Sequence, residues 1–168
     1  MTKRISAFIL SFAFSLLVAA PPLLQGKHAL QEPMVKRNVY PADADAKTEI
    51  AEALGRAAKS DKRVLLVFGA NWCLDCHVLD QALRTGDSGK LAEQYYEVVH
   101  VDIGRGEKNV DLAKQYKVDL EKGVPNVAVL DAQGKLLTSS SAFESARNMD
   151  EQQVIDFLNK WKAKKKAA

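Results

Sequence analysis

The 168-residue sequence contains little cysteine and no marked excess of charge of either sign. Its two cysteines are too few to hold a domain of this size together by a network of disulfides, so a working pair is favoured over a structural one. The formal net charge is only +3, and loss of Lys3 and Arg4 with a cleaved leader would bring it closer to zero. A nucleic-acid partner is therefore not expected.

Metal ligands are also scarce. Only three histidines accompany the two cysteines, and His28 and His100 have no spacing that supports a shared site with them. A closed zinc site normally needs four ligands, so neither a metal nor another cofactor is expected. The sequence has no internal repeat, and the basic tail at residues 164–168 is interpreted as a solvated chain end.

Charge is absent from a long stretch near the N-terminus. Lys3 and Arg4 precede an uncharged run over residues 5–24 that includes two adjacent prolines. A basic start followed by an apolar run is typical of a secretory signal, and residues 1–26 are predicted to be a signal peptide. The run is also about long enough to span a bilayer, so a retained membrane anchor is the alternative. Both interpretations place the protein in the periplasm or otherwise outside the cytoplasm, where a disulfide can persist.

The rest of the chain has the composition of one ordinary domain. Hydrophobic residues make up 47% of the sequence and charged residues 27%, which is typical of a soluble globular protein. Residues 27–44 are interrupted by prolines and are interpreted as a linker with a possible short strand near residues 35–40. Residues 45–163 alternate between apolar runs and segments with helical spacing. This order predicts an α/β fold with a central mixed β-sheet flanked by helices.

Local signals predict where the elements of this domain begin. Residues suited to cap helices are Asp45, Ser88, Asn109 and Asp150, the last with Gln153 placed to complete a capping box. Apolar or β-branched runs predict strands at residues 64–68, 98–101, 124–130 and 135–138.

The two cysteines lie three residues apart, where the run at residues 64–68 gives way to a helical segment. A helix start offers unpaired N–H groups and a partial positive charge, and both stabilise a thiolate. Because the thiolate is the reactive form, Cys73 is the expected nucleophile. Cys76, one turn further into the helix, is the expected resolving thiol.

The residues from Trp72 to Cys76, with their strand and helix, and the Val124-Pro125 pair before a strand-turn-strand together resemble the thioredoxin superfamily. They are most similar to exported bacterial thioredoxin-like proteins and to the C-terminal domain of transmembrane thiol:disulfide interchange proteins. The resemblance implies a thioredoxin-like fold in which Pro125 is cis and lies against the cysteines. It also implies that Val124 pairs its backbone with an extended substrate segment. Trp72 would offer a flat apolar contact to a partner, or would be a half-buried core aromatic.

The sequence departs from this family at a buried acid. The family carries the acid six residues before the first cysteine, near a lysine on the neighbouring strand, and the matching residues here are Val67 and Val98. Asp75 and His77 are candidates for proton transfer in its place, as is an ordered water. Alternatively, Asp75 favours the helix start and His77 is a solvated surface residue.

The resemblance implies thiol–disulfide exchange with protein substrates, with a separate thiol protein as the upstream electron donor. A role as reductase or electron carrier is favoured because no strong thiolate-stabilising residue lies between the cysteines. A non-catalytic thioredoxin-fold binding module is one alternative. Another is a c-type haem protein, because Cys73-x-x-Cys76-His77 also satisfies the haem attachment pattern, with Met34 or Met149 available as a further ligand.

Overall fold

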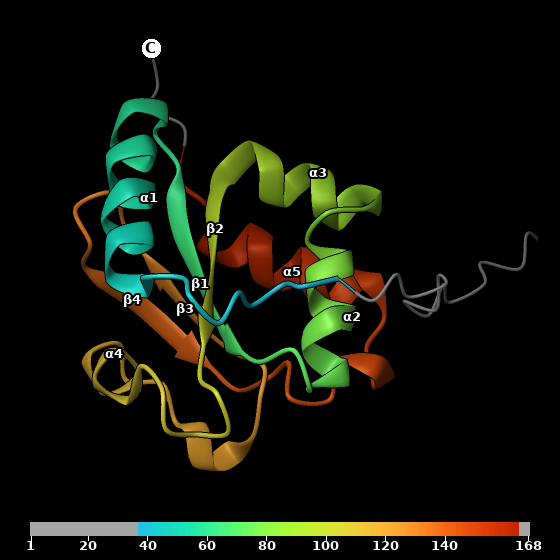
Figure 1. Ribbon diagram of the computed structural model, residues 1–168. Helices are drawn as coiled ribbons and strands as arrows, with labels where there is room; N and C mark the ends of the chain where they lie inside the picture. The colour runs from blue at the N-terminus through green and yellow to red at the C-terminus, as the bar shows by residue number, and fades with distance from the viewer. Residues whose placement is uncertain (1–36, 165–168) are drawn as a thin grey trace, which may run out of the picture.

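The computed structural model describes residues 37–164, in which a four-stranded sheet lies between two layers of helices (Figure 1). The strands have the spatial order β2–β1–β3–β4. β1 runs parallel to β2 and antiparallel to β3, and β3 is antiparallel to β4. The mixed sheet expected from the sequence is therefore confirmed. The strands are β1 (Arg63–Gly69), β2 (Tyr96–Asp102), β3 (Asn126–Leu130) and β4 (Leu136–Ser140).

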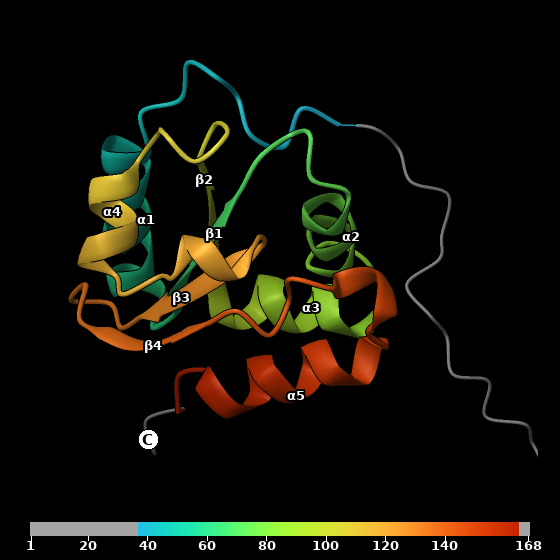
Figure 2. The same cartoon turned by 90° about the horizontal axis from the view of Figure 1, so that it is seen from below.

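The helices cover both faces of the sheet (Figure 2). One face packs against α1 (Ala46–Ser60) and α4 (Val110–Gln115). The opposite face packs against α2 (Leu74–Ala82), α3 (Gly86–Tyr95) and α5 (Glu151–Trp161). Two short 3-10 helices, η1 (Leu120–Lys122) and η2 (Ala146–Asn148), lie in the segments before β3 and before α5.

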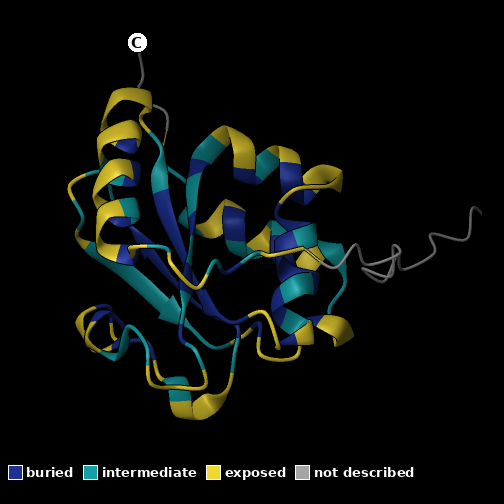
Figure 3. Ribbon diagram, in the orientation of Figure 1, coloured by how far each residue is buried: buried dark blue, intermediate teal, exposed yellow. Residues whose placement is uncertain are grey.

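β1 is the buried centre of the fold (Figure 3). Leu66 and Phe68 point into the core beneath α1 and α4, whereas Leu65 and Val67 point into the core beneath α2, α3 and α5. Successive side chains of a strand point to opposite faces, so a strand covered on both faces is apolar at every position. This is why the run at residues 64–68 has no polar alternation.

Two of the predicted helix caps are confirmed and two are not. Asn109 directly precedes α4, but its side chain donates to the Asp102 carbonyl oxygen and does not cap the helix. The Asp45 carboxylate accepts hydrogen bonds from the first turn of α1, and Asp150 and Gln153 form the expected capping box of α5. Ser88, by contrast, does not cap α3, which begins two residues earlier at Gly86. The Ser88 side chain is buried instead, and its hydroxyl donates to the Ala82 carbonyl oxygen at 2.7 Å.

Residues 37–44, here called the strap, run across the end of the sheet where β1 leads into α2 (Figures 1 and 2). The strap contains no strand, so a strand at residues 37–40 is not confirmed, and residues 35–36 lie outside the described part of the chain. The predicted signal peptide at residues 1–26 and residues 165–168 of the basic tail also lie outside it. Within residues 37–164, no helix has both the length and the apolar character needed to cross a membrane.

Candidate redox site

Cys73 occupies the N-cap position of α2, directly after the turn that follows β1. Its backbone is extended, with φ −85° and ψ 112°, and the Cys76 N–H donates to the Cys73 sulfur at 3.1 Å. The sulfur thus takes the place of the oxygen that usually caps a helix start. A thiolate here is stabilised both by this N–H group and by the positive end of the helix.

Cys73 and Cys76 are joined by a disulfide, and their exposures differ. Cys73 keeps 6% of its surface exposed, whereas Cys76 is fully buried. Trp72 and Leu74, the residues on either side of Cys73, are the exposed large hydrophobic residues of the described chain, at 57% and 41%. Of the two cysteines, only Cys73 keeps some exposed surface, and it does so between two exposed apolar side chains.

The loop before β3 lies against this disulfide. The Val124–Pro125 peptide bond is cis, and the Val124 carbonyl oxygen lies 3.4 Å from the Cys73 sulfur. Val124 is partly buried against both cysteines. The structure thus brings the pair Cys73 and Cys76 together with the pair Val124 and Pro125, which lies about 50 positions later in the sequence.

Trp72 is held by the loop that follows β2. Its indole Nε1 donates to the Gly104 carbonyl oxygen at 2.6 Å, while more than half of the side chain stays exposed. Trp72 belongs to none of the hydrophobic core clusters of the described chain, so its role as a contact for a partner stays a prediction. The ring forms a flat apolar surface beside Cys73.

Asp75 and His77 both have partners other than the cysteines. Asp75 Oδ1 accepts hydrogen bonds from the Arg147 backbone N–H at 2.9 Å and from its Nε at 3.1 Å. His77 Nε2 lies 2.9 Å from the Asn71 carbonyl oxygen and must donate to it, because a carbonyl oxygen only accepts. Within residues 37–164, no hydrogen bond joins either side chain to a cysteine sulfur, so proton transfer by Asp75 or His77 stays a prediction.

A buried polar cluster beneath Cys76 was not predicted. Tyr40 of the strap is 1% exposed and packs with both cysteines. The His100 ring lies edge-on to the Tyr40 ring, with centroids 5.3 Å apart. His100 Nε2 is 3.4 Å from Oδ1 of Asp80, which is itself buried and paired with Arg84.

Burial sets the protonation of this cluster. It lowers the pKa of His100 to about 4 despite the opposing effect of Asp80, so the imidazole is neutral at pH 7. Burial raises the pKa of Tyr40, and the Asp80 and Asp102 carboxylates raise it further. The Tyr40 hydroxyl therefore stays protonated and can donate a hydrogen bond.

One signal in the sequence could have predicted part of this cluster. Asp80 follows Cys76 by four residues, which places the two on the same face of a helix, and that face is buried. A charged residue at a buried helix position needs partners. No comparable signal marked Tyr40, because residues 27–44 were assigned to a linker.

Asn71 fixes the strap to the turn before Cys73. Its Oδ1 accepts from the backbone N–H groups of Val39 and Tyr40, at 3.0 and 3.1 Å. Its Nδ2 donates to the Tyr40 carbonyl oxygen at 2.6 Å and to Asn38 Oδ1 at 2.7 Å. Lys108 adds a further contact, from its Nζ to the Ala42 carbonyl oxygen at 3.2 Å. These bonds place Tyr40 behind the disulfide.

The alternative of haem attachment conflicts with this geometry. It requires a thioether to each cysteine, but the two sulfurs are bonded to each other. Met149 packs in the core beneath α2, α3 and α5, and Met34 lies outside the described residues. Across residues 37–164, no group of three or more His, Cys, Asp or Glu side chains is arranged to hold a metal ion.

Three comparisons relate this geometry to known proteins. A family model described as thioredoxin-like matches residues 45–132. No curated protein matches the chain. Among solved structures, a disulphide isomerase from Xylella fastidiosa Temecula1 is 36% identical with a TM-score of 0.69, and the match covers 74% of this chain and 96% of that one.

Two further structures share the fold at lower identity. The C-terminal domain of DsbD from Neisseria meningitidis, in its oxidised form, is 20% identical with a TM-score of 0.53, over 71% of this chain and 97% of that domain. A thioredoxin from Thermus thermophilus is 18% identical with a TM-score of 0.50, over 66% of this chain and 81% of that one.

Proposed function

This chain belongs to the thioredoxin-like family, and on that premise we propose that it exchanges thiols and disulfides with protein substrates through Cys73 and Cys76. One observation carries the proposal. The cysteine at the start of α2 is the one that keeps some exposed surface, and the resolving cysteine lies buried one turn behind it. This asymmetry gives the two cysteines separate roles in the exchange.

The exchange proceeds in two displacements. The Cys73 thiolate attacks one sulfur of a substrate disulfide, a new S–S bond forms, and the other substrate sulfur leaves as a thiolate that takes up a proton. Cys76 then loses its proton and attacks the Cys73 sulfur, which releases the second substrate thiolate. Two electrons pass to the substrate, and the Cys73–Cys76 disulfide remains.

Three further residues are proposed to bind the substrate. Trp72 offers an exposed flat ring, and the Val124 carbonyl oxygen lies beside the Cys73 sulfur. A substrate segment in extended conformation would hydrogen-bond to the Val124 backbone, with Pro125 holding that loop against the disulfide. An apolar side chain of the substrate would then cover Trp72.

We propose that the protein works as a reductase or electron carrier that receives electrons from a separate thiol protein. The Asp75 carboxylate lies between the cysteines and is paired with Arg147, so its charge opposes a Cys73 thiolate less than a free carboxylate would. No residue between the cysteines strongly favours the thiolate. A reduction potential as high as that of a strong oxidant, about −120 mV, would contradict this direction.

An exported location is proposed from Lys3, Arg4 and the uncharged run that follows them. Expression of the full chain in a bacterial host should deliver it outside the cytoplasm. Fractionation would locate the protein, and the mass of the purified chain would show whether residues 1–26 are removed. A chain found with its leader intact in the membrane fraction would indicate an anchor instead.

The exchange is tested by trapping its intermediate. Cys76→Ser leaves the first displacement possible and removes the second, so mixed disulfides with substrate proteins should accumulate. Cys73→Ser is the matched control and should abolish them. The wild-type protein should also accelerate the reduction of insulin by a thiol reductant. If no Cys73-dependent adduct forms and insulin reduction stays at background, the protein is a binding module that has kept the fold.

A further inference from the structure

Cys76 must lose a proton in the second displacement, and Asp80, the buried acid one turn further along α2, is already paired with Arg84. The buried acid that assists this step in the family is missing here. Val67 occupies the position where the family carries that acid, and it is fully buried in an apolar core. Asp75 and His77, on the same helix as Cys76, are engaged by Arg147 and by the Asn71 carbonyl oxygen. The polar group that packs with Cys76 comes from the strap instead.

That group is the Tyr40 hydroxyl. It is buried, and it has no hydrogen-bond partner among the residues that the structure describes. A buried hydroxyl without a partner is costly, so such a group calls for an explanation. In the disulfide form the hydroxyl makes no hydrogen bond to either cysteine sulfur, and a disulfide sulfur is only a weak acceptor.

Gly69 shows how close the hydroxyl and the sulfur are. A Cβ added at this last residue of β1 would lie 2.7 Å from the Cys76 sulfur and would also collide with the Tyr40 hydroxyl oxygen. Both atoms therefore occupy the space that a larger side chain at position 69 would need. Both lie beside Gly69, and only glycine leaves room for them.

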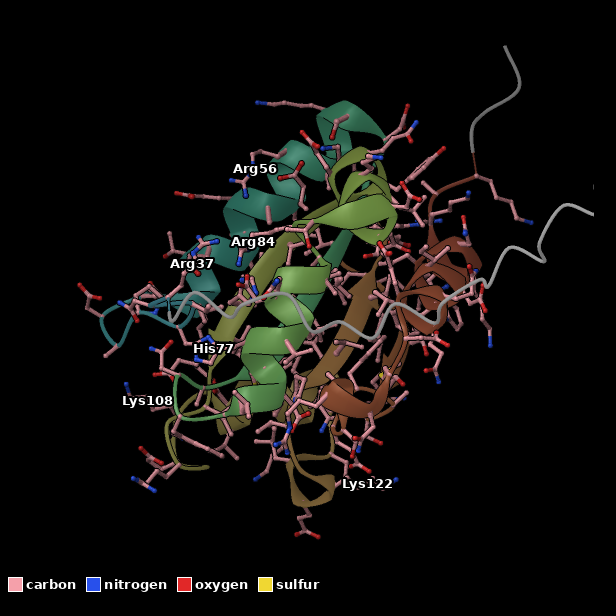
Figure 4. The ribbon with its side chains drawn as sticks, turned by 90° about the vertical axis from the view of Figure 1, so that its right-hand side faces the viewer. Arg37, Arg56, His77, Arg84, Lys108 and Lys122 are labelled. Carbon is pink, nitrogen blue, oxygen red and sulfur yellow. A yellow bond between two sulfur atoms is a disulfide. The ribbon has the colours of Figure 1, made fainter. Side chains whose placement is uncertain are left out.

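The charges around the cluster keep Tyr40 as a donor. The Asp80 carboxylate is paired with Arg84, and the Asp102 carboxylate is paired with Lys108 at 2.9 Å. Both carboxylates oppose ionisation of the hydroxyl. Two further groups face the cluster, the neutral His100 and the strap's Arg37, which lies on the same side of the molecule as Arg84 (Figure 4).

We propose that Tyr40 is a positioning residue whose hydroxyl donates a hydrogen bond to the Cys76 sulfur once the disulfide is open. This inference rests on the proposed exchange reaction and explains how it proceeds without the buried acid. A thiolate is a much stronger acceptor than a disulfide sulfur, so the bond forms mainly in the reduced protein. Tyr40 keeps its own proton throughout, and the proton of Cys76 leaves to solvent or to the departing substrate thiolate.

Two consequences can be measured. The hydrogen bond lowers the pKa of Cys76, because it stabilises the thiolate more than the thiol. It also favours the reduced protein over the disulfide, and so raises the reduction potential. Tyr40→Phe removes the hydroxyl and keeps the ring against His100, so it tests both consequences with little change in packing.

The first measurement uses Cys73→Ala, which leaves Cys76 as the one thiol. The rate of its alkylation against pH gives the Cys76 pKa, with urea unfolding and circular dichroism to show that each variant is folded. Adding Tyr40→Phe should raise the pKa by about one unit, a tenfold loss of thiolate at a given pH. In the protein with both cysteines, Tyr40→Phe should shift the glutathione equilibrium at pH 7 about threefold toward the disulfide.

Tyr96→Phe is the matched control. The Tyr96 hydroxyl is also buried, but it donates to the Leu158 carbonyl oxygen at 2.6 Å, and Tyr96 begins β2 at the end of the sheet away from the cysteines. It should lose stability and leave the Cys76 pKa unchanged. An unchanged Cys76 pKa in Tyr40→Phe, or equal shifts in both variants, would overturn the inference. If the wild-type protein reduces no insulin but Tyr40→Phe still raises the Cys76 pKa, the proposed function is refuted and the contact between Tyr40 and Cys76 is not.

Discussion

His100 is the described residue on which pH should act most strongly. Its ring lies between Tyr40 and Asp80 with 20% of the side chain exposed, and desolvation lowers its pKa from 6.5 to about 4. In the unfolded chain the imidazole binds a proton near pH 6.5, whereas in the folded protein it does so only near pH 4. Between these values the unfolded state holds more protons. Stability therefore falls as the pH falls through this window.

We expect His100 alone to cost the protein about 2 kcal/mol of unfolding free energy when the pH drops from 7 to 5. His100→Asn should remove this part of the pH dependence. Urea unfolding at the two pH values measures the difference for each protein. The same dependence in His100→Asn as in wild type would show that His100 is not the group responsible.

At this scale the sequence located the residues of the proposed exchange but not their surroundings. Cys73, Cys76 and Pro125 could be predicted because strand, motif and helix follow one another within a few residues or match a family pattern. Tyr40 and His100 meet through folding, and neither carries a local signal. Position 67, where the family carries a buried acid, is occupied here by valine.

Among the elements, the strap depends on one side chain. Asn71 makes four hydrogen bonds to it, two accepted and two donated. The strap has no helix or strand of its own, so its order depends on these bonds and on burial of Tyr40. Loss of Asn71 should therefore release the strap without unfolding the sheet.

Asn71→Ala is expected to lower the unfolding free energy by about 2 kcal/mol, because several bonds of roughly 1 kcal/mol each are lost. The amide protons of Val39 and Tyr40 should exchange with solvent much faster, while those of β1 stay protected. Hydrogen exchange followed by NMR measures both. Asn38→Ala, which removes one of the four bonds, should show a fraction of the effect. Unchanged exchange at Val39 and Tyr40 would mean that the strap is held by other contacts.

Element boundaries were predictable where the stabilising group is local. Asp45 and Asp150 cap the helices that follow them directly. The start of α3 was misplaced because its acceptor comes from a distant segment. Glu151, 63 residues further on, accepts from the Ser88 N–H at 3.0 Å. Local capping rules do not include such a partner.

At the scale of the whole molecule, the redox site and the α5 contact with β2 lie at opposite ends of the sheet. The cysteines follow Gly69, which pairs with Asp102 at the last position of β2. The Tyr96–Leu158 hydrogen bond lies at the first position of β2. Leu158 is fully buried in the core beneath α2, α3 and α5. Global stability can therefore be changed without touching the disulfide.

Leu158→Ala should lower the unfolding free energy by about 3 kcal/mol, because it leaves a cavity in a close-packed core. The equilibrium constant with glutathione should stay within about twofold of wild type, since 1 kcal/mol at the site would already change it several-fold. Urea unfolding and a glutathione titration provide the two values. Leu158→Met, which nearly conserves volume, should cost less than about 1.5 kcal/mol. A large shift of the glutathione equilibrium in Leu158→Ala would show that core and site are coupled.

The overall architecture was the most predictable feature. Many separate apolar patterns over residues 45–163 indicate alternating strands and helices, so the prediction does not depend on any single contact. The strap was the least predictable. Prolines at residues 33 and 41 made it resemble a linker, and its structure depends on partners that come later in the sequence.

Asn71, which holds the strap, follows it by 31 to 33 positions, and His100 comes later still. A chain that emerges N-terminus first, from a ribosome or through a translocation pore, presents Tyr40 well before the surfaces that receive it exist. The strap is therefore among the first segments made and among the last to dock. Assembly of the finished site has to wait until at least residue 125 has emerged, because Val124 and Pro125 complete it.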